Sequence, residues 1–166
     1  FTNGYIIALT GTNGKTTTIN LINHILSDNN FISKLGGNVG IPFSINVLDE
    51  LKNKYNETIY HVLELSSFQL EDIKYFKPDI SIILNISPDH LDHHKNFNNY
   101  LNSKIRISMN QDKKGYAIFN DNNLLDIHSN SKAKKITFRV SNDNEFFKND
   151  KKISFYNLKK KNQNHS

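Results

Sequence analysis

The chain has 166 residues, 37% of them hydrophobic and 22% charged, with a net charge of +5 and no cysteine. Its size and composition predict one globular domain, and the lack of cysteine excludes disulfides and thiolate metal sites and favours a cytoplasmic protein. No stretch is typical of a membrane-spanning helix or a signal peptide, so we expect no membrane partner. The lysines lie mostly late in the chain among polar residues, without the aromatic interleaving of nucleic-acid binders, so we expect no nucleic-acid partner.

Apolar strands that alternate with amphipathic helices predict an α/β fold. The expected elements are a strand at residues 5–9, a helix at 16–26, strands at 59–65 and 80–85, a helix at 96–109 and a strand at 116–120. The apolar sides of the two helices are Ile19, Leu21, Ile22, Ile25 and Leu26, and Phe97, Tyr100, Leu101, Ile105 and Met109. We expect a doubly wound, mostly parallel sheet covered by helices.

The last part of the chain is expected to differ from this core. Residues 124–128 are predicted to form a short helix, 136–140 a strand and 144–156 a hairpin. Together the strand and the hairpin would form a small antiparallel β patch toward the C-terminus. A polar tail follows at residues 159–166.

A glycine-rich loop joins the first predicted strand to the first helix. Gly11 and Gly14 permit a tight turn whose N–H groups, with the positive end of the helix, can face an anion. Lys15 is placed to reach the β and γ phosphates of a nucleotide, and the Thr16 hydroxyl to contact magnesium. Leu9 stands where the usual motif has its first glycine, so the loop is a shortened P-loop. The alternative is an ordinary strand-to-helix turn with a solvated lysine.

Polar residues also follow the second and third predicted strands. Ligands of open parallel sheets bind beyond the carboxyl ends of the strands, so these residues are candidates for function. Glu64 ends the second strand, and a carboxylate beside phosphates suits magnesium. His90 follows the third strand between Asp89 and Asp92, where it could orient a ligand or a metal. The alternatives are a paired edge carboxylate for Glu64 and helix capping for the residues around His90.

Three further features are less specific. Residues 36–40 form a second glycine-rich loop, which either approaches a substrate phosphate or makes a turn before Pro42. His93 and His94 lie in a polar run and are predicted to be exposed to solvent. Lys104, from its position in the helical pattern alone, is a helix-surface lysine.

Four segments and one spacing, taken together, resemble the Mur ligases. The segments are Gly11-Thr12-Asn13-Gly14-Lys15-Thr16-Thr17, Gly36-Gly37-Asn38-Val39-Gly40, Leu63-Glu64-Leu65-Ser66-Ser67-Phe68-Gln69-Leu70 and Asn85-Ile86-Ser87-Pro88-Asp89-His90-Leu91-Asp92. Tyr100, followed four residues later by Lys104, is the fifth match. The resemblance implies that residues 1–166 are the central ATP-binding domain of a three-domain enzyme, a fragment without the N-terminal UDP-binding and C-terminal domains.

The resemblance also implies roles for individual residues. ATP would be bound by Gly11, Thr12, Asn13, Gly14, Lys15, Thr16 and Thr17. The catalytic residues would be Lys15, Glu64, His90 and Lys104, and the substrate would contact Gly37, Asn38, Ser66 and His90. Two magnesium ions would be held by Thr16, Glu64, His90 and Lys104. In the family the lysine that matches Lys104 is carbamylated, which turns a cation into an anion that can ligate magnesium.

The implied reaction is an ATP-dependent ligation in peptidoglycan precursor synthesis. The segment at 63–70 is most similar to family members whose partners are UDP-N-acetylmuramoyl-L-alanine and D-glutamate. ATP would phosphorylate the carboxylate of the first substrate, and the amine of D-glutamate would attack the acyl phosphate. We expect a monomer, and at most weak nucleotide binding by this chain alone.

Three other readings of the function remain open at this point. Within the superfamily, the alternatives are a different Mur ligase or a folylpolyglutamate synthase, although Ser67-Phe68-Gln69 argues against both. Outside it, a nucleotide-dependent switch could use the same loop without ligating anything. A basic nucleic-acid binder is a third reading, and it predicts steeply salt-dependent binding to any duplex.

Overall fold

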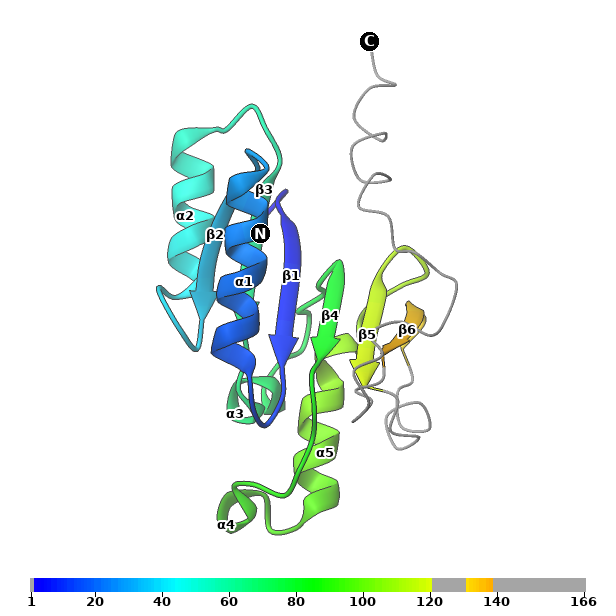
Figure 1. Ribbon diagram of the computed structural model, residues 1–166. Helices are drawn as coiled ribbons and strands as arrows, with labels where there is room; N and C mark the ends of the chain where they lie inside the picture. Colours follow the sequence, from blue (N-terminus) through cyan, green and yellow to red (C-terminus); the bar gives the residue numbers. More distant parts are fainter. Residues whose placement is uncertain (1, 121–130, 139–166) are drawn as a thin grey trace.

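The computed structural model describes residues 2–120 and 131–138 as an α/β domain with helices on both faces of one sheet (Figure 1). None of the helices in this described part of the chain is long and apolar enough to cross a lipid bilayer. The elements, in chain order, are β1 (Tyr5–Thr10), α1 (Lys15–Asp28), β2 (Ile32–Gly37), α2 (Phe43–Asn53), β3 (Ile59–Glu64), α3 (Ser67–Glu71), β4 (Ile80–Ile83), α4 (Leu91–His94), α5 (Phe97–Ile105), a 3-10 turn (Arg106–Ser108), β5 (Tyr116–Asn120) and β6 (Lys134–Phe138).

The sheet has six strands in the order β2-β3-β1-β4-β5-β6, and every neighbouring pair is parallel. Parallel neighbours need right-handed crossovers, which place α1 on one face and α2, α3 and α5 on the other. In Figure 1, α1 lies in front of the sheet. The predicted doubly wound parallel core is therefore confirmed, and β4 ends at Ile83, two residues earlier than expected.

The two faces of the sheet are buried by different helices. Ile6 and Ala8 of β1 belong to a core cluster with Leu70 of α3 and Leu101 of α5. Because side chains alternate along a strand, the residues between them face α1, whose Ile19 is fully buried. Strands covered on both sides have few polar residues, which is why their hydrophobic runs were readable from the sequence.

The apolar sides of the predicted helices are only partly buried. Leu21 and Ile25 of α1, which belong to the predicted apolar side, are 55% and 39% exposed, so this part of that side does not enter the core. The helix 96–109 is confirmed as α5 followed by the 3-10 turn, with Asn96 as its N-cap, and Met109 beyond it is exposed. Residues at helical spacing cover a wide side of a helix, and only those that contact the sheet are buried.

Four elements had no counterpart in the sequence prediction. They are the edge strand β2, whose sequence ISKLGG has little hydrophobic alternation, the helix α2, and the short helices α3 and α4. β2 forms because its backbone pairs with β3 from Ile32 to Gly37. Residues 36–40, expected to be a loop, therefore contain the end of a strand.

The strand predicted at residues 136–140 is present, with bounds shifted by two residues, but its expected place in an antiparallel patch is wrong. The observed β6 (Lys134–Phe138) pairs in parallel with β5 and extends the main sheet, so it is not part of an antiparallel patch. Residues 121–133 separate the two strands, and a connection of that length suits a parallel crossover better than a hairpin. The helix at 124–128 and the hairpin at 144–156 lie outside the described residues.

Candidate active site

The glycine loop connects the end of β1 to the start of α1. Gly14 takes the N-cap position with φ of 79°, a left-handed conformation that favours glycine. The side chain of Lys15 folds back over the loop, and its Nζ donates to the carbonyl oxygen of Thr12 at 2.8 Å. Thr17, in the first turn of α1, is exposed. The loop is therefore a turn at the start of α1 with its lysine held against it, and its role as a P-loop stays a prediction.

Asn85, which follows β4, fixes this loop in place. Its carbonyl oxygen accepts from Thr12 N at 3.0 Å, its Oδ1 accepts from Asn13 N at 2.8 Å, and its Nδ2 donates to Asn13 O at 3.0 Å. The Thr12 hydroxyl also accepts from Ser87 N at 3.0 Å and lies 3.1 Å from the hydroxyl of Tyr100. Asn85 had no predicted role in the site. Its place directly after a strand was the signal that could have found it.

Glu64, the last residue of β3, is the buried carboxylate of the site, with 1% of its surface exposed. Its Oε2 accepts from the Thr16 hydroxyl at 2.9 Å, and its Oε1 accepts from Asn38 Nδ2 at 3.1 Å. Both partners are neutral, and Glu64 has no ion pair among the residues that the structure describes. A buried carboxylate without a countercharge is costly, so this position favours a bound cation.

Gly37 and Asn38 hold Glu64 in place from the neighbouring strand. Gly37 pairs in register with Glu64 and has φ of 100°. A Cβ at Gly37 would come within 2.2 Å of the carbonyl oxygen of Glu64, so only glycine fits between the two strand ends. Asn38 N donates to that same carbonyl at 2.8 Å. The second glycine-rich segment therefore positions the candidate metal ligand.

Lys104 of α5 is buried, with 2% exposure, and the expectation of a helix-surface lysine is wrong. Its Nζ donates to the Gly11 carbonyl at 2.9 Å, lies 3.4 Å from the hydroxyl of Thr10 and is 4.8 Å from the centre of the Tyr100 ring. Burial, and to a lesser degree repulsion from Lys15, lowers the pKa of Lys104 to about 8. A large fraction of neutral amine is therefore available at mildly alkaline pH.

The remaining predicted residues lie near the same edge of the sheet but do not all meet. Ser66 caps α3 in a reciprocal pair with Gln69, in which Ser66 Oγ accepts from Gln69 N at 3.2 Å. His90 has φ of 49°, lies 3.5 Å from the carboxylate of Asp89 and packs against the ring of Phe68. No contact joins His90 to Glu64 in the described residues. The roles of Ser66 and His90 stay predictions.

His94 was expected to be solvated, and this is wrong, because it is 3% exposed. Its ring lies between Phe68 and Tyr100, at centroid distances of 5.6 and 5.2 Å. The polar run in which it lies suggested exposure, but the packing of α4 against α5 turns it inward. Its neighbour His93 is partly exposed, as predicted.

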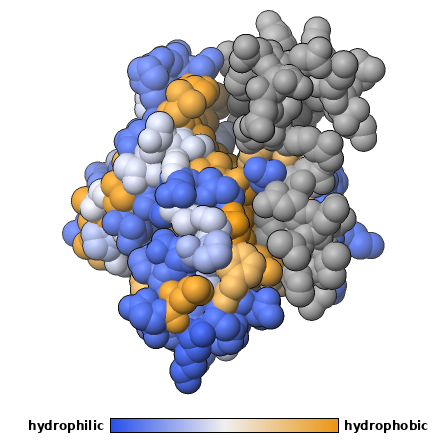
Figure 2. Space-filling view, turned by 60° about the horizontal axis from the view of Figure 1, so that its bottom comes forward, coloured by the Kyte–Doolittle hydropathy of each residue, from blue (hydrophilic) through white to orange (hydrophobic). Residues whose placement is uncertain are grey.

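These groups lie at the carboxyl ends of neighbouring strands. The helix after β1 leaves to one face of the sheet and the helices after its neighbours β3 and β4 to the other, and open α/β sheets bind their ligands at such a point. Figure 2 looks toward this end of the molecule, and most of the coloured surface in view is hydrophilic, with hydrophobic residues in separate patches. A polar surface of this kind suits a charged ligand.

A doubly wound sheet with a glycine loop and a buried carboxylate on neighbouring strands is typical of nucleotide-binding α/β domains. Residues 9–165 match the Mur ligase middle domain, so the chain belongs to the Mur ligase family, as the motifs predicted. It is 46% identical over 138 residues to the UDP-N-acetylmuramoylalanine--D-glutamate ligase of Caldicellulosiruptor saccharolyticus, an alignment with 80% of this chain and 29% of that protein. The ligase of the same name from Rickettsia bellii is 47% identical over 71% of this chain and 24% of its own length. The chain thus spans less than a third of these relatives.

Solved structures agree on the fold. A UDP-N-acetylmuramoyl-L-alanyl-D-glutamate--2,6-diaminopimelate ligase aligns with a TM-score of 0.64 at 22% identity, over 86% of this chain and 33% of that one. A MurF ligase from Thermotoga maritima, solved in complex with ADP, aligns with a TM-score of 0.63 at 22% identity, over 82% of this chain and 33% of that one. At this identity the likeness concerns the fold alone.

Proposed function

We propose that residues 1–166 are the central ATP-binding domain of a ligase that joins D-glutamate to UDP-N-acetylmuramoyl-L-alanine in peptidoglycan precursor synthesis. The observation that carries the proposal is the buried carboxylate of Glu64, which lies beside the glycine loop and has only neutral partners among residues 2–120 and 131–138. Support for the substrates comes from the relatives of 46% and 47% identity, whose name states this activity.

In this proposal the glycine loop binds the phosphates of ATP. The N–H groups of Gly11 to Gly14 and the start of α1 present partial positive charge to the β and γ phosphates. Lys15, now bonded to its own loop, swings onto the γ-phosphate and neutralises the charge that develops during transfer. The bonds from Asn85 keep the loop rigid, so little ordering is needed when nucleotide binds.

The residues present fit a magnesium ion. Thr16 and Glu64 offer a hydroxyl and a carboxylate 2.9 Å apart, which are the hard oxygen ligands that magnesium prefers. When bound, the ion neutralises phosphate charge and supplies the countercharge that Glu64 lacks. Asn38 orients the Glu64 carboxylate by donating to its other oxygen, Oε1. Two ions are expected, and His90 would help to place the second.

Lys104 fits the carbamate role in chemical terms. Carbon dioxide reacts with a neutral amine, and burial lowers the pKa of Lys104 to about 8, which provides that form. The product is an anion next to the glycine loop, where the unmodified ammonium would oppose Lys15. Mass spectrometry of protein kept in bicarbonate tests this, and an unmodified lysine under those conditions would contradict it.

The proposed ligation has two steps, formation of an acyl phosphate and its attack by an amine. A carboxylate oxygen of UDP-N-acetylmuramoyl-L-alanine attacks the γ-phosphorus of ATP, and ADP leaves with the electrons of the broken P–O bond. The amine nitrogen of D-glutamate attacks the acyl carbon, phosphate leaves, and the nitrogen loses a proton. Gly37, Asn38, Ser66 and His90 would line the path of the first substrate.

The test uses the complete protein with ATP and both substrates, and measures phosphate release. Release that requires D-glutamate supports the ligase, and nucleotide binding or hydrolysis that ignores D-glutamate would support a switch and contradict the proposal. Lys15→Ala and Glu64→Ala should abolish ligation while the domain stays folded. Lys113→Ala and Glu57→Ala are matched controls, because these exposed residues precede β5 and β3 at the opposite edge of the sheet.

A further inference from the structure

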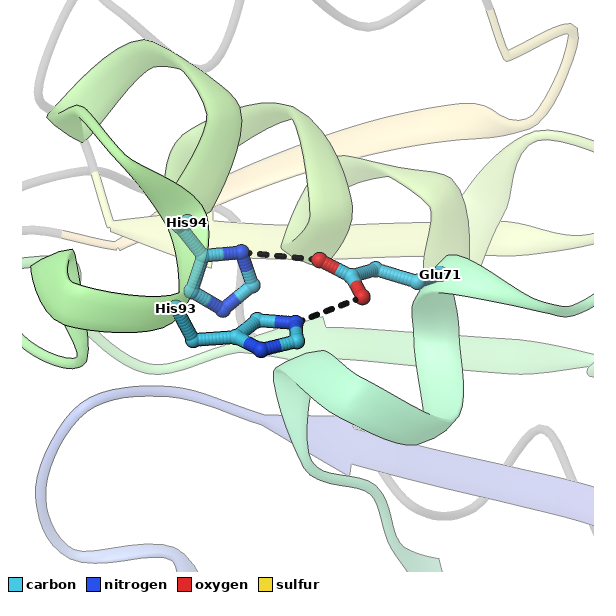
Figure 3. A group of neighbouring side chains, drawn as sticks. All are labelled: Glu71, His93 and His94. Carbon is cyan, nitrogen blue, oxygen red and sulfur yellow. Dashed lines mark hydrogen bonds and ion pairs between the residues drawn. The ribbon is translucent and has the colours of Figure 1, made fainter.

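A second group of candidate metal ligands lies outside the site described above. Glu71 is the last residue of α3, and His93 and His94 are the last residues of α4 (Figure 3). His93 Nε2 lies 3.0 Å from one oxygen of Glu71, and His94 Nδ1 lies 2.8 Å from the other. All three ligand atoms lie within 4.8 Å of one another, so one small ion could contact them together.

The imidazole of His94 also has the surroundings of a metal ligand. Its side chain is fully buried, and its Nε2 lies 3.0 Å from the hydroxyl of Ser67, itself buried. Its Nδ1 has no hydrogen-bond partner in the part of the chain that the structure describes, although it lies within ion-pair distance of Glu71. When Nε2 carries the proton toward Ser67, the lone pair of Nδ1 faces a carboxylate oxygen, an arrangement that a cation between the two would stabilise.

We propose that Glu71, His93 and His94 bind one divalent transition-metal ion of the zinc type, with water as the fourth ligand. Two imidazoles and one carboxylate form a common ligand set for zinc, whereas magnesium prefers oxygen ligands. Ligands about 2.0–2.1 Å from a tetrahedral ion lie about 3.3 Å apart. The observed 2.8 and 3.0 Å are slightly shorter, and the partly exposed side chains of His93 and Glu71 can rotate outward.

The surroundings complete the features of a metal site. The Ser67 hydroxyl would fix the tautomer and direction of His94, as outer-shell partners of zinc ligands do. The ring of Phe68 packs against both imidazoles, at centroid distances of 4.7 Å from His93 and 5.6 Å from His94. Binding would use the Nδ1–H tautomer of His93, in which the lone pair of Nε2 faces the ion beside Glu71.

An ion here would join two segments that are separate in the chain. α3 follows β3 and α4 follows β4, so the ion would fasten the two helices at the carboxyl edge of the sheet. The site does not depend on the proposed ligase activity, because none of its ligands is assigned to ATP or substrate.

The experiment titrates the 166-residue chain with Zn²⁺ by calorimetry and by competition with a chromogenic chelator. We expect one tight site per chain, and Co²⁺ bound there should give the visible absorption of a tetrahedral complex. His93→Ala and Glu71→Gln should each weaken Zn²⁺ binding at least about 10-fold, and Ser67→Ala should weaken it by roughly 10-fold through loss of the outer-shell bond. Millimolar Mg²⁺ should not compete.

His24→Ala is the matched control, because His24 also lies beside a carboxylate, 3.3 Å from Asp28, but on an exposed helix face. It should leave Zn²⁺ affinity unchanged. Unchanged affinity in both His93→Ala and Glu71→Gln would overturn the proposal, as would an equal loss in His24→Ala or His90→Ala. Circular dichroism of each variant separates loss of ligands from loss of the fold.

Discussion

Glu64 and Glu71 lie seven residues apart on either side of the β3–α3 turn, and the fold gives them opposite surroundings. Glu64 is buried, and within the described part of the chain its carboxylate is bonded only to the neutral side chains of Thr16 and Asn38. Glu71 is partly exposed and faces two imidazoles. The same chemical group, a glutamate carboxylate, thus suits a hard cation at Glu64 and a borderline transition metal at Glu71. The neighbours of a carboxylate, more than the carboxylate itself, determine which ion it selects.

The largest expected effect comes from removing the charge of Glu64. In the complete protein, Glu64→Gln should lower ligation by at least roughly 100-fold, because the magnesium ligand is lost. The stability of the 166-residue chain should not fall, because the substitution removes a buried charge without a countercharge. Phosphate release and urea unfolding measure the two effects. Glu57→Gln is the control, and near-normal ligation by Glu64→Gln would contradict the assignment.

The second prediction concerns the buried amine that faces the glycine loop. The pKa of Lys104 is lowered from 10.5 to about 8 in the folded protein. Burial of the charged amine therefore lowers the free energy of unfolding by its full amount below pH 8, and this loss disappears as the pH rises toward 10.5. The stability of the unsubstituted chain relative to Lys104→Met should therefore rise between pH 7 and pH 10, by about 2 to 3 kcal/mol.

This measurement needs carbon dioxide-free buffers, so that the amine stays unmodified, and urea unfolding at each pH. A difference between the two proteins that does not change with pH would mean that Lys104 is as solvated as an ordinary lysine. Lys113→Met, at an exposed position, should show no such pH dependence.

The third prediction tests how Glu64 is held. Gly37→Ala would place a Cβ 2.2 Å from the carbonyl oxygen of Glu64 at φ of 100°, so we expect a loss of about 2 to 3 kcal/mol. Gly40→Ala is the matched control, since Gly40 also has positive φ, of 79°, but its Cβ would be 3.4 Å from its nearest neighbour. It should cost about 1 kcal/mol. Equal losses of unfolding free energy in the two variants would show that the contact with Glu64 costs nothing beyond the positive φ that both glycines share.

The smallest effect is expected at the residue between the two regions. Tyr100 contacts the Thr12 hydroxyl on one side and the His94 ring on the other. Tyr100→Phe keeps the ring contacts and removes one hydrogen bond, so the chain should lose about 1 kcal/mol in urea unfolding and keep its Zn²⁺ affinity. Tyr75→Phe, at a 90% exposed position, should cost nothing measurable. A parallel loss of Zn²⁺ affinity in Tyr100→Phe would mean that the two sites are coupled.

Much of this molecule was readable from local patterns. The strands β1, β3, β4 and β5 and the helices α1 and α5 follow from hydrophobic runs and helical spacing, because each pattern lies within one segment. The candidate ligand Glu64 was found for a similar reason, since the last residue of a parallel strand lies at the ligand-binding edge. The edge strand β2 was missed because backbone pairing with β3, and not its own residues, forms it.

The sequence alone determined the glycine loop, the α/β class with its parallel core and the family, because these depend on patterns within single segments of the chain. Only the tertiary structure decided the burial of Lys104, whose amine meets a carbonyl 93 residues away. The same holds for His94, turned inward between α3 and α5, and for β6, which joined the parallel sheet. No periodic pattern in the sequence predicts that a polar side chain is buried or that an edge strand forms. Their environment is set by long-range partners, and those partners are fixed only when the sheet has formed.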